Sequence, residues 1–380
     1  MKTYSNLIVT VGASLKGNIL RDDTIKEYYL NNDLEALSEQ MATNKWGDPE
    51  SERKYGSEIN STVSLLRNFT QIENAKFVRG SLYLFISDTE DGRKIGTLLK
   101  NFFEQNDEFQ FGSVKLIKLE GLTHEDEHKF GTKGLRNVVR EFAKVTRTHA
   151  SDVIVNSTGG YKAQIAFALA LGQALKFPVY YRFEAFSKII KMPPLPVSLD
   201  WEIYINNFEI LEYLESQTFV EEQALKAFGY NNFAELPSEI KSFVDREKID
   251  KIACVDFNPM GQVFIESARE LIRMETPLPE SSKMPKDKIL YNSKEAHALE
   301  FEGKHRVMER LSRLTFVDRV HMYDFHAREK DLISVKLSVD NIIRVMYGNK
   351  KGTIYLDVNT TAKSRREMIA AVEEIKRNLV

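Results

Sequence analysis

The chain has 380 residues, of which 42% are apolar and 28% are charged, and it carries a formal net charge of −2 and a single cysteine, Cys254. This length predicts two or three domains of ordinary globular composition. The lone cysteine excludes internal disulfides and any zinc site built from several cysteines. No stretch of eighteen apolar residues occurs, so we expect no membrane span, and the N-terminal segment lacks a signal-peptide pattern, so we expect a cytoplasmic protein.

Charge is distributed unevenly along the chain. From Ser281 to the C-terminus there are twenty lysines and arginines against fourteen aspartates and glutamates, so this region carries +6 and the preceding 280 residues carry −8. A basic C-terminal region on an acidic body indicates that the tail contacts a polyanion. A solvated face rich in lysine and arginine is the alternative interpretation.

Prolines predict where the domains divide. Six of the ten prolines fall in two short stretches, "MPPLP" and "TPLPESSKMP". Because proline disfavours the interior of helices and sheets, both stretches indicate domain boundaries. We therefore expect a body over residues 1–191, a middle part over 192–276 and a tail over 285–380.

Five apolar runs in the body predict buried strands, and helical patterns lie between them. The runs are residues 6–12, 81–87, 114–120, 152–158 and 177–184, with helices expected over 93–106 and 132–149. Apolar strands alternating with helices are typical of an α/β fold with a mainly parallel sheet that is covered on both faces. Ligands of such sheets bind beyond the carboxyl ends of the strands.

The middle part and the tail follow different patterns. In the middle part, helical patterns over 207–216, 219–229 and 238–249 precede two apolar runs around an "NPMG" turn, which predicts a hairpin within 252–267. This order predicts a winged-helix-like connector, and because the module is not conspicuously basic, a connecting or dimerisation role is favoured over DNA binding. The tail predicts a helical stretch over 293–315, four strands over 318–359 and a last helix over 363–379, which make a small α+β domain.

Small polar residues follow three of the body's strands. Backbone amides at helix N-termini, together with hydroxyls, favour bound anions, so these strand ends predict a phosphate site, although a tight capped turn is the simpler alternative. Neither GxxxxGK[ST] nor GxGxxG occurs, which disfavours ATPases and dehydrogenases. The candidate ligand-binding residues are Gly12, Ser14, Ser87, Asp88, Thr89, Asn156, Ser157, Thr158, Gly159, Gly160 and Lys162.

The pattern Asn156-x-Thr-Gly-Gly-x-Lys162, with the turns at Ser14 and Ser87–Gly92, resembles the signature of CARF domains, the Rossmann-like ligand sensors of CRISPR ancillary proteins. The resemblance covers about residues 1–275, and Tyr161 stands where the family often has threonine. It implies a homodimer that binds a cyclic oligoadenylate, most often the tetra-adenylate, across its two-fold axis. It implies no cofactor beyond this activator, and no metal.

The tail from about residue 288 to the end resembles RelE-type toxins, which cut mRNA in the ribosomal A site through attack of a ribose 2′-OH on the adjacent phosphate. The resemblance implies mRNA and the ribosome as partners and a reaction without a metal. The family's catalytic cations fall on Lys336, Arg344, Lys363, Arg365 and Arg366. Its frequent C-terminal tyrosine has no match, since Met368 lies nearest, and His321 or His326 is the candidate acid–base group.

Together the two resemblances imply a cyclic-oligoadenylate-activated, metal-independent endoribonuclease of type III CRISPR antiviral defence. Two alternatives stay open. A helical HEPN-type ribonuclease needs Arg-x(4–6)-His, which the segment from Arg319 to His326 fits. A ligand-responsive transcriptional regulator would use the connector and tail only to bind nucleic acid. The ring size of the activator and the need for ribosomes also stay open.

Overall fold

The structure is a computed structural model that describes residues 2–43, 46–149, 152–183, 186, 188–193, 199–291, 300–301, 306–326, 332–349 and 352–379. The chain forms two compact units. The first comprises Met1–Leu199 and Tyr213–Ser267, and the second comprises Asp200–Glu212 and Ala268–Val380. The predicted middle part, residues 192–276, is thus divided between the two units.

The first unit is built on a six-stranded sheet with the order β3-β2-β1-β4-β5-β6. The first five strands are mutually parallel, and β6 pairs antiparallel with β5 at the edge. Each predicted strand of the body is confirmed. The bounds are β1 (Thr3–Thr10), β2 (Lys76–Ser87), β3 (Ser113–Leu119), β4 (Val153–Asn156), β5 (Val179–Tyr181) and β6 (Ile190–Lys191).

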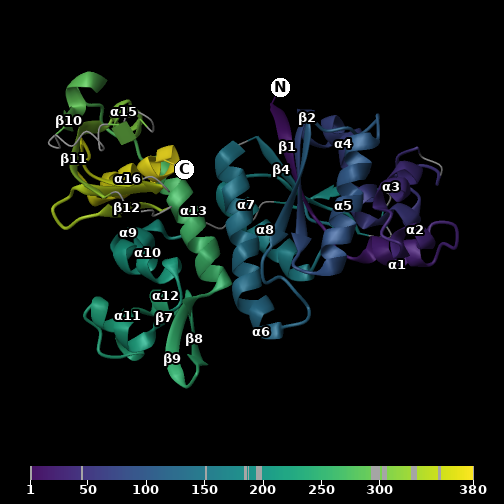
Figure 1. The fold of residues 1–380 in the computed structure, drawn as a ribbon, viewed down its shortest axis with the longest axis horizontal. Helices are drawn as coiled ribbons and strands as arrows, with labels where there is room; N and C mark the ends of the chain where they lie inside the picture. Colours follow the sequence, from purple (N-terminus) through teal and green to yellow (C-terminus); the bar gives the residue numbers. More distant parts are fainter. Residues whose placement is uncertain are drawn as a thin grey trace. The chain divides into compact units, whose positions relative to one another are not determined.

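Helices cover both faces of this sheet (Figure 1). The helices of this part of the unit are α1 (Ser14–Leu20), α2 (Lys26–Leu30), α3 (Leu34–Ala42), α4 (Gly56–Glu73), α5 (Glu90–Gln105), α6 (Glu127–Lys129), α7 (Leu135–His149) and α8 (Lys162–Leu175). Neighbouring residues of β1 enter different cores, because successive side chains of a strand point to opposite faces. Leu7 packs with residues of α3, α4 and α5, whereas Ile8 packs with residues of α7 and α8. The prediction of a parallel sheet covered on both faces is confirmed.

The part of the first unit from Tyr213 to Ser267 contains a small antiparallel sheet with the order β7-β9-β8. Its elements are β7 (Phe219–Val220), α11 (Glu221–Ala227), α12 (Ser238–Lys241), β8 (Val244–Ile249) and β9 (Ile252–Phe257), followed by α13 (Pro259–Glu275). The segment predicted as one helix over 238–249 therefore holds a short helix and a strand.

The predicted hairpin around the "NPMG" turn is wrong, because α13 begins there. The side-chain oxygen of Asn258 accepts the Gly261 N–H at 2.8 Å, which caps the helix, and Pro259 suits the first helical position. The hairpin lies earlier, between β8 and β9. Its turn residues Asp250 and Lys251 have φ angles of +49° and +70°, as a tight hairpin turn requires.

The second unit is built on a five-stranded sheet with the order β10-β11-β14-β13-β12. Its four predicted strands and last helix are confirmed, while β10 was not predicted. Of the helical stretch expected over 293–315, the structure describes α15, and most of the remainder lies outside the described residues. The elements are α9 (Trp201–Asn206), α10 (Phe208–Ser216), β10 (Ile289–Tyr291), α15 (Val307–Ser312), β11 (Val317–His326), β12 (Ile333–Leu337), β13 (Ile343–Asn349), β14 (Gly352–Thr360) and α16 (Arg365–Leu379).

Alternation along these strands gives the sheet one buried and one more open face. Val320, Val335, Val345 and Leu356 are buried, and α15 and α16 pack against the sheet. The residues between them point to the opposite face, which bears Lys336 and other polar side chains. The two units together confirm the predicted fold class, an α/β domain with a parallel sheet and further α+β structure.

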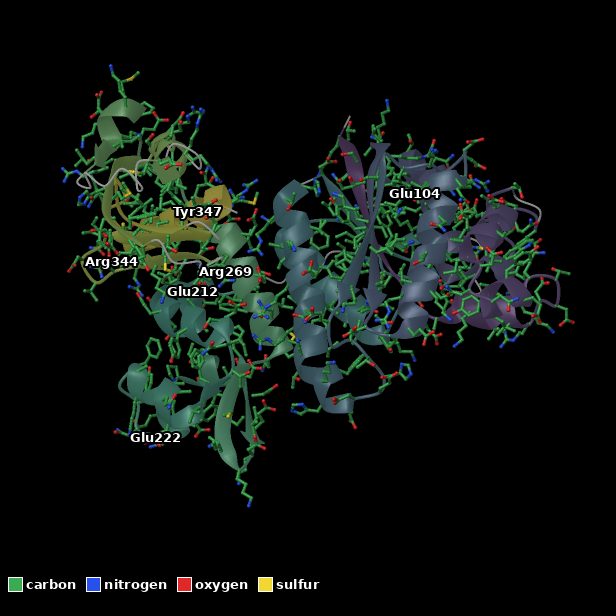
Figure 2. All side chains as sticks on the ribbon, in the orientation of Figure 1. Glu104, Glu212, Glu222, Arg269, Arg344 and Tyr347 are labelled. Atoms are coloured by element: carbon green, nitrogen blue, oxygen red, sulfur yellow. The ribbon has the colours of Figure 1, made fainter. Side chains whose placement is uncertain are left out.

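A partly buried charge cluster lies in the second unit, where Glu212 and Arg269 are labelled in Figure 2. Glu212 accepts hydrogen bonds from Arg269 Nε and Lys376 Nζ, both at 2.8 Å. Burial raises the pKa of Glu212, but Arg269 and Lys376 more than offset this effect and hold it at about 2. Because this pKa lies below its unfolded value, the pair stabilises the unit above the unfolded pKa, and the contribution is lost as pH falls towards about 2.

We expect Glu212→Gln to lower the free energy of unfolding at pH 7 by about 3 kcal/mol, because the carboxylate charge that Arg269 and Lys376 share is removed, although Lys376 keeps Glu373 at 2.7 Å. Between pH 5 and pH 2 the difference from the wild type should shrink, which denaturant titrations at several pH values measure. The matched control is Glu222→Gln, which removes an exposed carboxylate paired with Lys226 and should change nothing measurable. Equal effects of the two substitutions would contradict the prediction.

Candidate functional site

The three polar strand ends of the first unit lie at one edge of the sheet. β1 pairs in parallel with both β2 and β4, with Thr10 opposite Phe85 and Val9 opposite Asn156. The hydroxyl of Thr10 donates to the Gly159 carbonyl at 2.5 Å, which joins the turn after β4 to the end of β1. The expected gathering of these segments at the carboxyl edge is therefore present.

The turn after β4 is held by its own polar side chains. Asn156 is fully buried; its Nδ2 donates to Ser61 Oγ at 2.7 Å and to Thr62 Oγ1 at 3.1 Å, both on α4. The Thr158 hydroxyl donates to Asn156 Oδ1 at 2.6 Å. Ser157 is also fully buried, and its hydroxyl has no hydrogen-bond partner in the described part of the chain. Asn156 and Ser157 thus point into the protein, whereas Lys162 is exposed at the start of α8.

Both glycines of the turn meet a physical requirement. Gly160 has a φ of +89°, a region that favours glycine, and this directs the next amide, of Tyr161, to Gln164 Oε1 at 2.7 Å. A Cβ on Gly159 would lie 2.7 Å from the Thr10 carbonyl and would collide with the carboxylate of Glu58. Only glycine allows this close approach.

Glu58 is a buried carboxylate at this edge that the sequence did not reveal as a site residue. Its Oε1 accepts the Gly12 N–H at 2.7 Å, and its Oε2 accepts the hydroxyls of Ser57 at 3.0 Å and Ser14 at 3.4 Å. The amide of Gly12 is therefore already bonded to an anion. A phosphate beside Gly12 and Ser14 would meet like charge, so the exposed Lys162 side of the edge suits an anion better.

The strand end after β2 caps a helix and anchors a loop. Thr89 Oγ1 accepts the Gly92 N–H at 3.0 Å at the start of α5 and lies 2.9 Å from Ser87 Oγ. Asp88 accepts the Gly121 N–H at 3.1 Å and lies 3.4 Å from Lys118 Nζ. The Gly121 amide and the Lys118 ammonium hold the pKa of Asp88 below its ordinary value, so it is a second anion at this edge.

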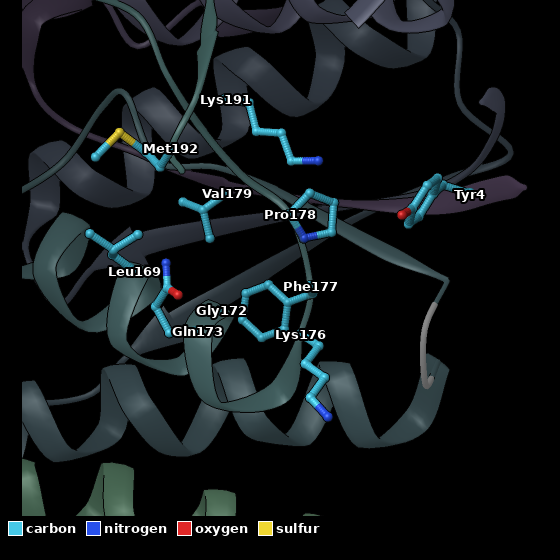
Figure 3. A pocket seen from close by; sticks show the side chains of 10 residues that line it. All are labelled: Tyr4, Leu169, Gly172, Gln173, Lys176, Phe177, Pro178, Val179, Lys191 and Met192. Atoms are coloured by element: carbon cyan, nitrogen blue, oxygen red, sulfur yellow. The ribbon is translucent and has the colours of Figure 1, made fainter. Parts of the chain in front are cut away.

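A hollow of about 270 Å³ lies at the other end of the same strands (Figure 3). Tyr4 lines it from the start of β1, and Val179 lines it from the start of β5. One of its two lysines, Lys191, is paired with Glu73 at 2.8 Å. None of the predicted ligand residues lines this hollow, so it is separate from the carboxyl edge.

In the second unit, three of the predicted catalytic residues fall into one row across four adjoining strands. Pairing sets Lys336 of β12 opposite Arg344 of β13, Arg344 opposite Asp357 of β14, and Asp357 opposite His321 of β11. Directly opposed residues share a face of the sheet. Arg344, labelled in Figure 2, is 55% exposed. Its Nε lies 3.8 Å from Asp357 Oδ1. The row combines two cations, a carboxylate and an imidazole on the open face.

Aromatic side chains flank this row. The rings of Tyr323 and Tyr355 lie 6.2 Å apart, and the ring of His326 meets Tyr355 edge-on at 5.2 Å. Burial, and after it the charge of Asp357, raises the pKa of Tyr323, so its phenol stays protonated at neutral pH and donates. His326 lies outside the row, is exposed, and pairs with Asp324 at 3.1 Å. Sequence reasoning missed both tyrosines, since aromatic residues in a strand are ordinary core formers.

The two arginines after β14 are bonded to segments other than the row. Arg365 donates to the Ile205 carbonyl at 2.7 Å and to Glu209 at 2.6 Å, while Arg366 donates to Thr276 Oγ1 at 3.0 Å. The backbone amide of Lys363 is bonded to Glu367 at 2.7 Å. These contacts fix the start of α16 to neighbouring segments of the second unit.

The helical-ribonuclease alternative does not fit this tail. Arg319 and His326 both lie on β11, which is an inner strand of the sheet. Two residues separated by six positions on an extended strand lie far apart, whereas the HEPN pattern needs a helix to bring them together.

Residues 53–195 match the model of a protein family described as CRISPR-associated protein (Cas_APE2256). The matched stretch begins before α4, which carries Glu58, and includes the whole Asn156–Lys162 turn. It supports a CRISPR-associated protein with a role in CRISPR defence, in agreement with the CARF resemblance of this turn. No curated protein matches the chain. Among the described helices, none is both long and apolar enough to cross a membrane.

The charge of Glu58 allows a direct test of what binds at this edge. Gln in its place can keep the bond from Gly12 and loses only the charge. A polyphosphate ligand should then bind roughly fivefold more tightly, because removal of one like charge at roughly 8 Å is worth about 1 kcal/mol. Titration calorimetry with cyclic tetra-adenylate measures the change. The control is Glu104→Gln at the far end of α5, which should leave affinity unchanged, and weaker binding by Glu58→Gln would contradict the prediction.

Proposed function

We propose that the chain is a ribonuclease of type III CRISPR defence that a cyclic oligoadenylate activates. The first unit binds the activator and the second unit cuts RNA. The single observation that carries the enzymatic part is the row of Lys336, Arg344, Asp357 and His321 on the open face of the second sheet. This arrangement suits a phosphate flanked by an acid–base group.

The carboxyl edge of the first unit supports the sensing role. The turn after β4 is rigid, since Asn156 ties it to α4 and Gly159 packs against β1. It presents the exposed Lys162 at a helix N-terminus, where positive charge and free amides favour phosphates. We propose cyclic tetra-adenylate as the activator and a homodimer as the binding form, as the CARF resemblance implies.

The row can perform metal-independent cleavage of RNA. A ribose O2′ forms a bond to the adjacent phosphorus, the P–O5′ bond breaks, and the products are a 2′,3′-cyclic phosphate and a 5′-hydroxyl. The attacking hydroxyl loses a proton to a base, and the leaving oxygen gains one from an acid. Arg344 and Lys336 stabilise the extra negative charge that develops on the phosphorane, as preorganised donors do.

The substrate that we propose is mRNA on the ribosome, in accordance with the RelE resemblance of the tail. The aromatic rings beside the row support single-stranded RNA, because unstacked bases stack on tyrosine. The +6 charge of the tail supports the same polyanionic partner.

Incubation of the purified chain with mRNA, with and without ribosomes, and with cyclic tri-, tetra- or hexa-adenylate tests this function. We expect cleavage only with an activating ring, and products that end in a 2′,3′-cyclic phosphate. Intact RNA under every condition would overturn the proposal. Ligand-dependent DNA binding with intact RNA would identify a transcriptional regulator instead.

A further inference from the structure

The row contains two buried polar atoms that have no hydrogen-bond partner among the residues that the structure describes. They are His321 Nε2 and Asp357 Oδ1, and they belong to directly opposed residues of β11 and β14. A buried donor or acceptor without a partner costs about 1–3 kcal/mol, so such groups are rare in native proteins unless they have a role.

These two atoms are chemical complements. A protonated Nε2 is a donor, and the carboxylate oxygen of Asp357 is an acceptor. On the other side of β11, the residue opposite His321 is Leu290 of β10. A leucine side chain cannot form a hydrogen bond with the imidazole. The cation nearest to Asp357 Oδ1 in the row is Arg344, with Nε at 3.8 Å, beyond hydrogen-bonding distance.

On these grounds we propose that His321 is the general base of the cleavage reaction and that Asp357 is its positioning residue. The proposal rests on the proposed ribonuclease function. When RNA is bound, the carboxylate of Asp357 accepts a hydrogen bond from the protonated Nε2 of His321, directly or through one water. The imidazole is then held in the tautomer whose other nitrogen, Nδ1, is free to act as a base.

The resulting step balances. Nδ1 of His321 takes the proton of the attacking 2′-OH as the O2′–P bond forms. The P–O5′ bond breaks, and the leaving O5′ takes a proton from water. Arg344 and Lys336 face the phosphate from the same row, and Asp357 stabilises the imidazolium that forms. His321 returns its proton to water and is ready for a second cleavage.

This assignment distinguishes the two histidines that the sequence left open. His326 lies at the end of β11, and its Nε2 is paired with Asp324. Its side chain is more than half exposed, and its ring meets Tyr355 rather than either cation of the row. We therefore expect His326 to contribute to RNA contact at most.

The test is single-turnover cleavage by the full chain with activator. His321→Ala should reduce the rate by about 10²–10⁴-fold, and added imidazole should restore part of it. His326→Ala should cost much less and should not respond to imidazole. The neutral control is Arg377→Ala on α16, an exposed residue outside the row, which should cut at the wild-type rate. His321→Asn, which keeps a polar side chain, serves if the alanine variant unfolds. Full activity of either His321 variant, or an imidazole-insensitive loss, would overturn the assignment.

The positioning role of Asp357 is tested by the pH dependence of the cleavage rate. The titratable groups that face His321 from the row and from its own strand are Asp357, Arg344, Lys336, Arg319 and Tyr323. Asp357→Asn removes the only carboxylate among these five, so the acidic limb of the rate profile should move to lower pH. If the acidic limb of the variant's pH–rate profile coincided with that of the wild type, Asp357 would not be the positioning residue. If the wild type itself does not cut RNA, the ribonuclease proposal fails, which is distinct from a wild type that cuts independently of His321.

Discussion

Replacement of Arg344 by alanine should reduce activated RNA cleavage by about 10²–10³-fold, the usual effect of removing one donor that stabilises a transition state. Arg344 lies between Lys336 and Asp357 in the row and is more than half exposed, so its loss removes a phosphate contact from an otherwise intact face. Single-turnover rates at saturating activator measure the effect. The free energy of unfolding should change little, because the nearest acid, Asp357, is not hydrogen-bonded to it.

Two further variants sharpen this prediction. Arg344→Lys keeps the charge but loses the planar fork, so it should recover only part of the activity. Arg377→Ala removes an exposed arginine of α16 from the same unit without touching the row, and it should cut RNA at the wild-type rate. Equal losses from Arg344→Ala and Arg377→Ala would mean that general positive charge, and not the row, supports cleavage.

Replacement of Gly159 by alanine should destabilise the first unit by about 2 kcal/mol and abolish activator binding, because an added methyl group overpacks a closed site. The new Cβ would lie 2.7 Å from the Thr10 carbonyl oxygen and against the Glu58 carboxylate, and Glu58 can withdraw only by breaking its hydrogen bond from the Gly12 amide. Denaturant titration and calorimetry with cyclic tetra-adenylate measure the two effects.

The control for Gly159 is Gly17→Ala on α1, where an added Cβ meets nothing within 4 Å. Alanine is the better helix former, so this variant should gain about 0.5–1 kcal/mol and should bind activator normally. If Gly159→Ala behaved like Gly17→Ala, the turn after β4 would not be the closely packed element described above.

The positions of strands could be predicted from the sequence where a local pattern of apolar residues determines them. β13 alternates buried Ile343 and Val345 with exposed Arg344, and β4 is an unbroken apolar run between polar turns. Such patterns follow from burial on one face or on both faces of a sheet, so no distant contact is needed to recognise them.

Other features depend on contacts that no local pattern contains. Glu58 reaches Gly12 across 46 positions of the chain, and nothing near either residue predicts their hydrogen bond. The "NPMG" segment carried a turn signal, yet Asn258 uses that signal to cap a long helix. The local sequence fits both a hairpin turn and a helix start, and only packing against the rest of the unit decides between them.

At the candidate site too, some contacts of the row could be predicted from the sequence and others could not. Lys336 and Arg344 come from neighbouring strands of a hairpin, so their proximity follows from sequence order. His321 and Asp357 meet because β14 inserts between β11 and β13. Strand order in a sheet is a tertiary property, which is why the sequence named two candidate histidines and the sheet order separates them.

The most direct test of the account is the length of ribosome-bound mRNA after incubation with the full chain, with and without cyclic tetra-adenylate, for the wild type and for Lys336→Ala/Arg344→Ala. We predict cleavage by the wild type only when the activator is present, and uncut RNA from the double variant although it binds the activator normally. Activator-dependent cleavage by the double variant at the wild-type rate would contradict the central claim that the row on the second sheet is the active site.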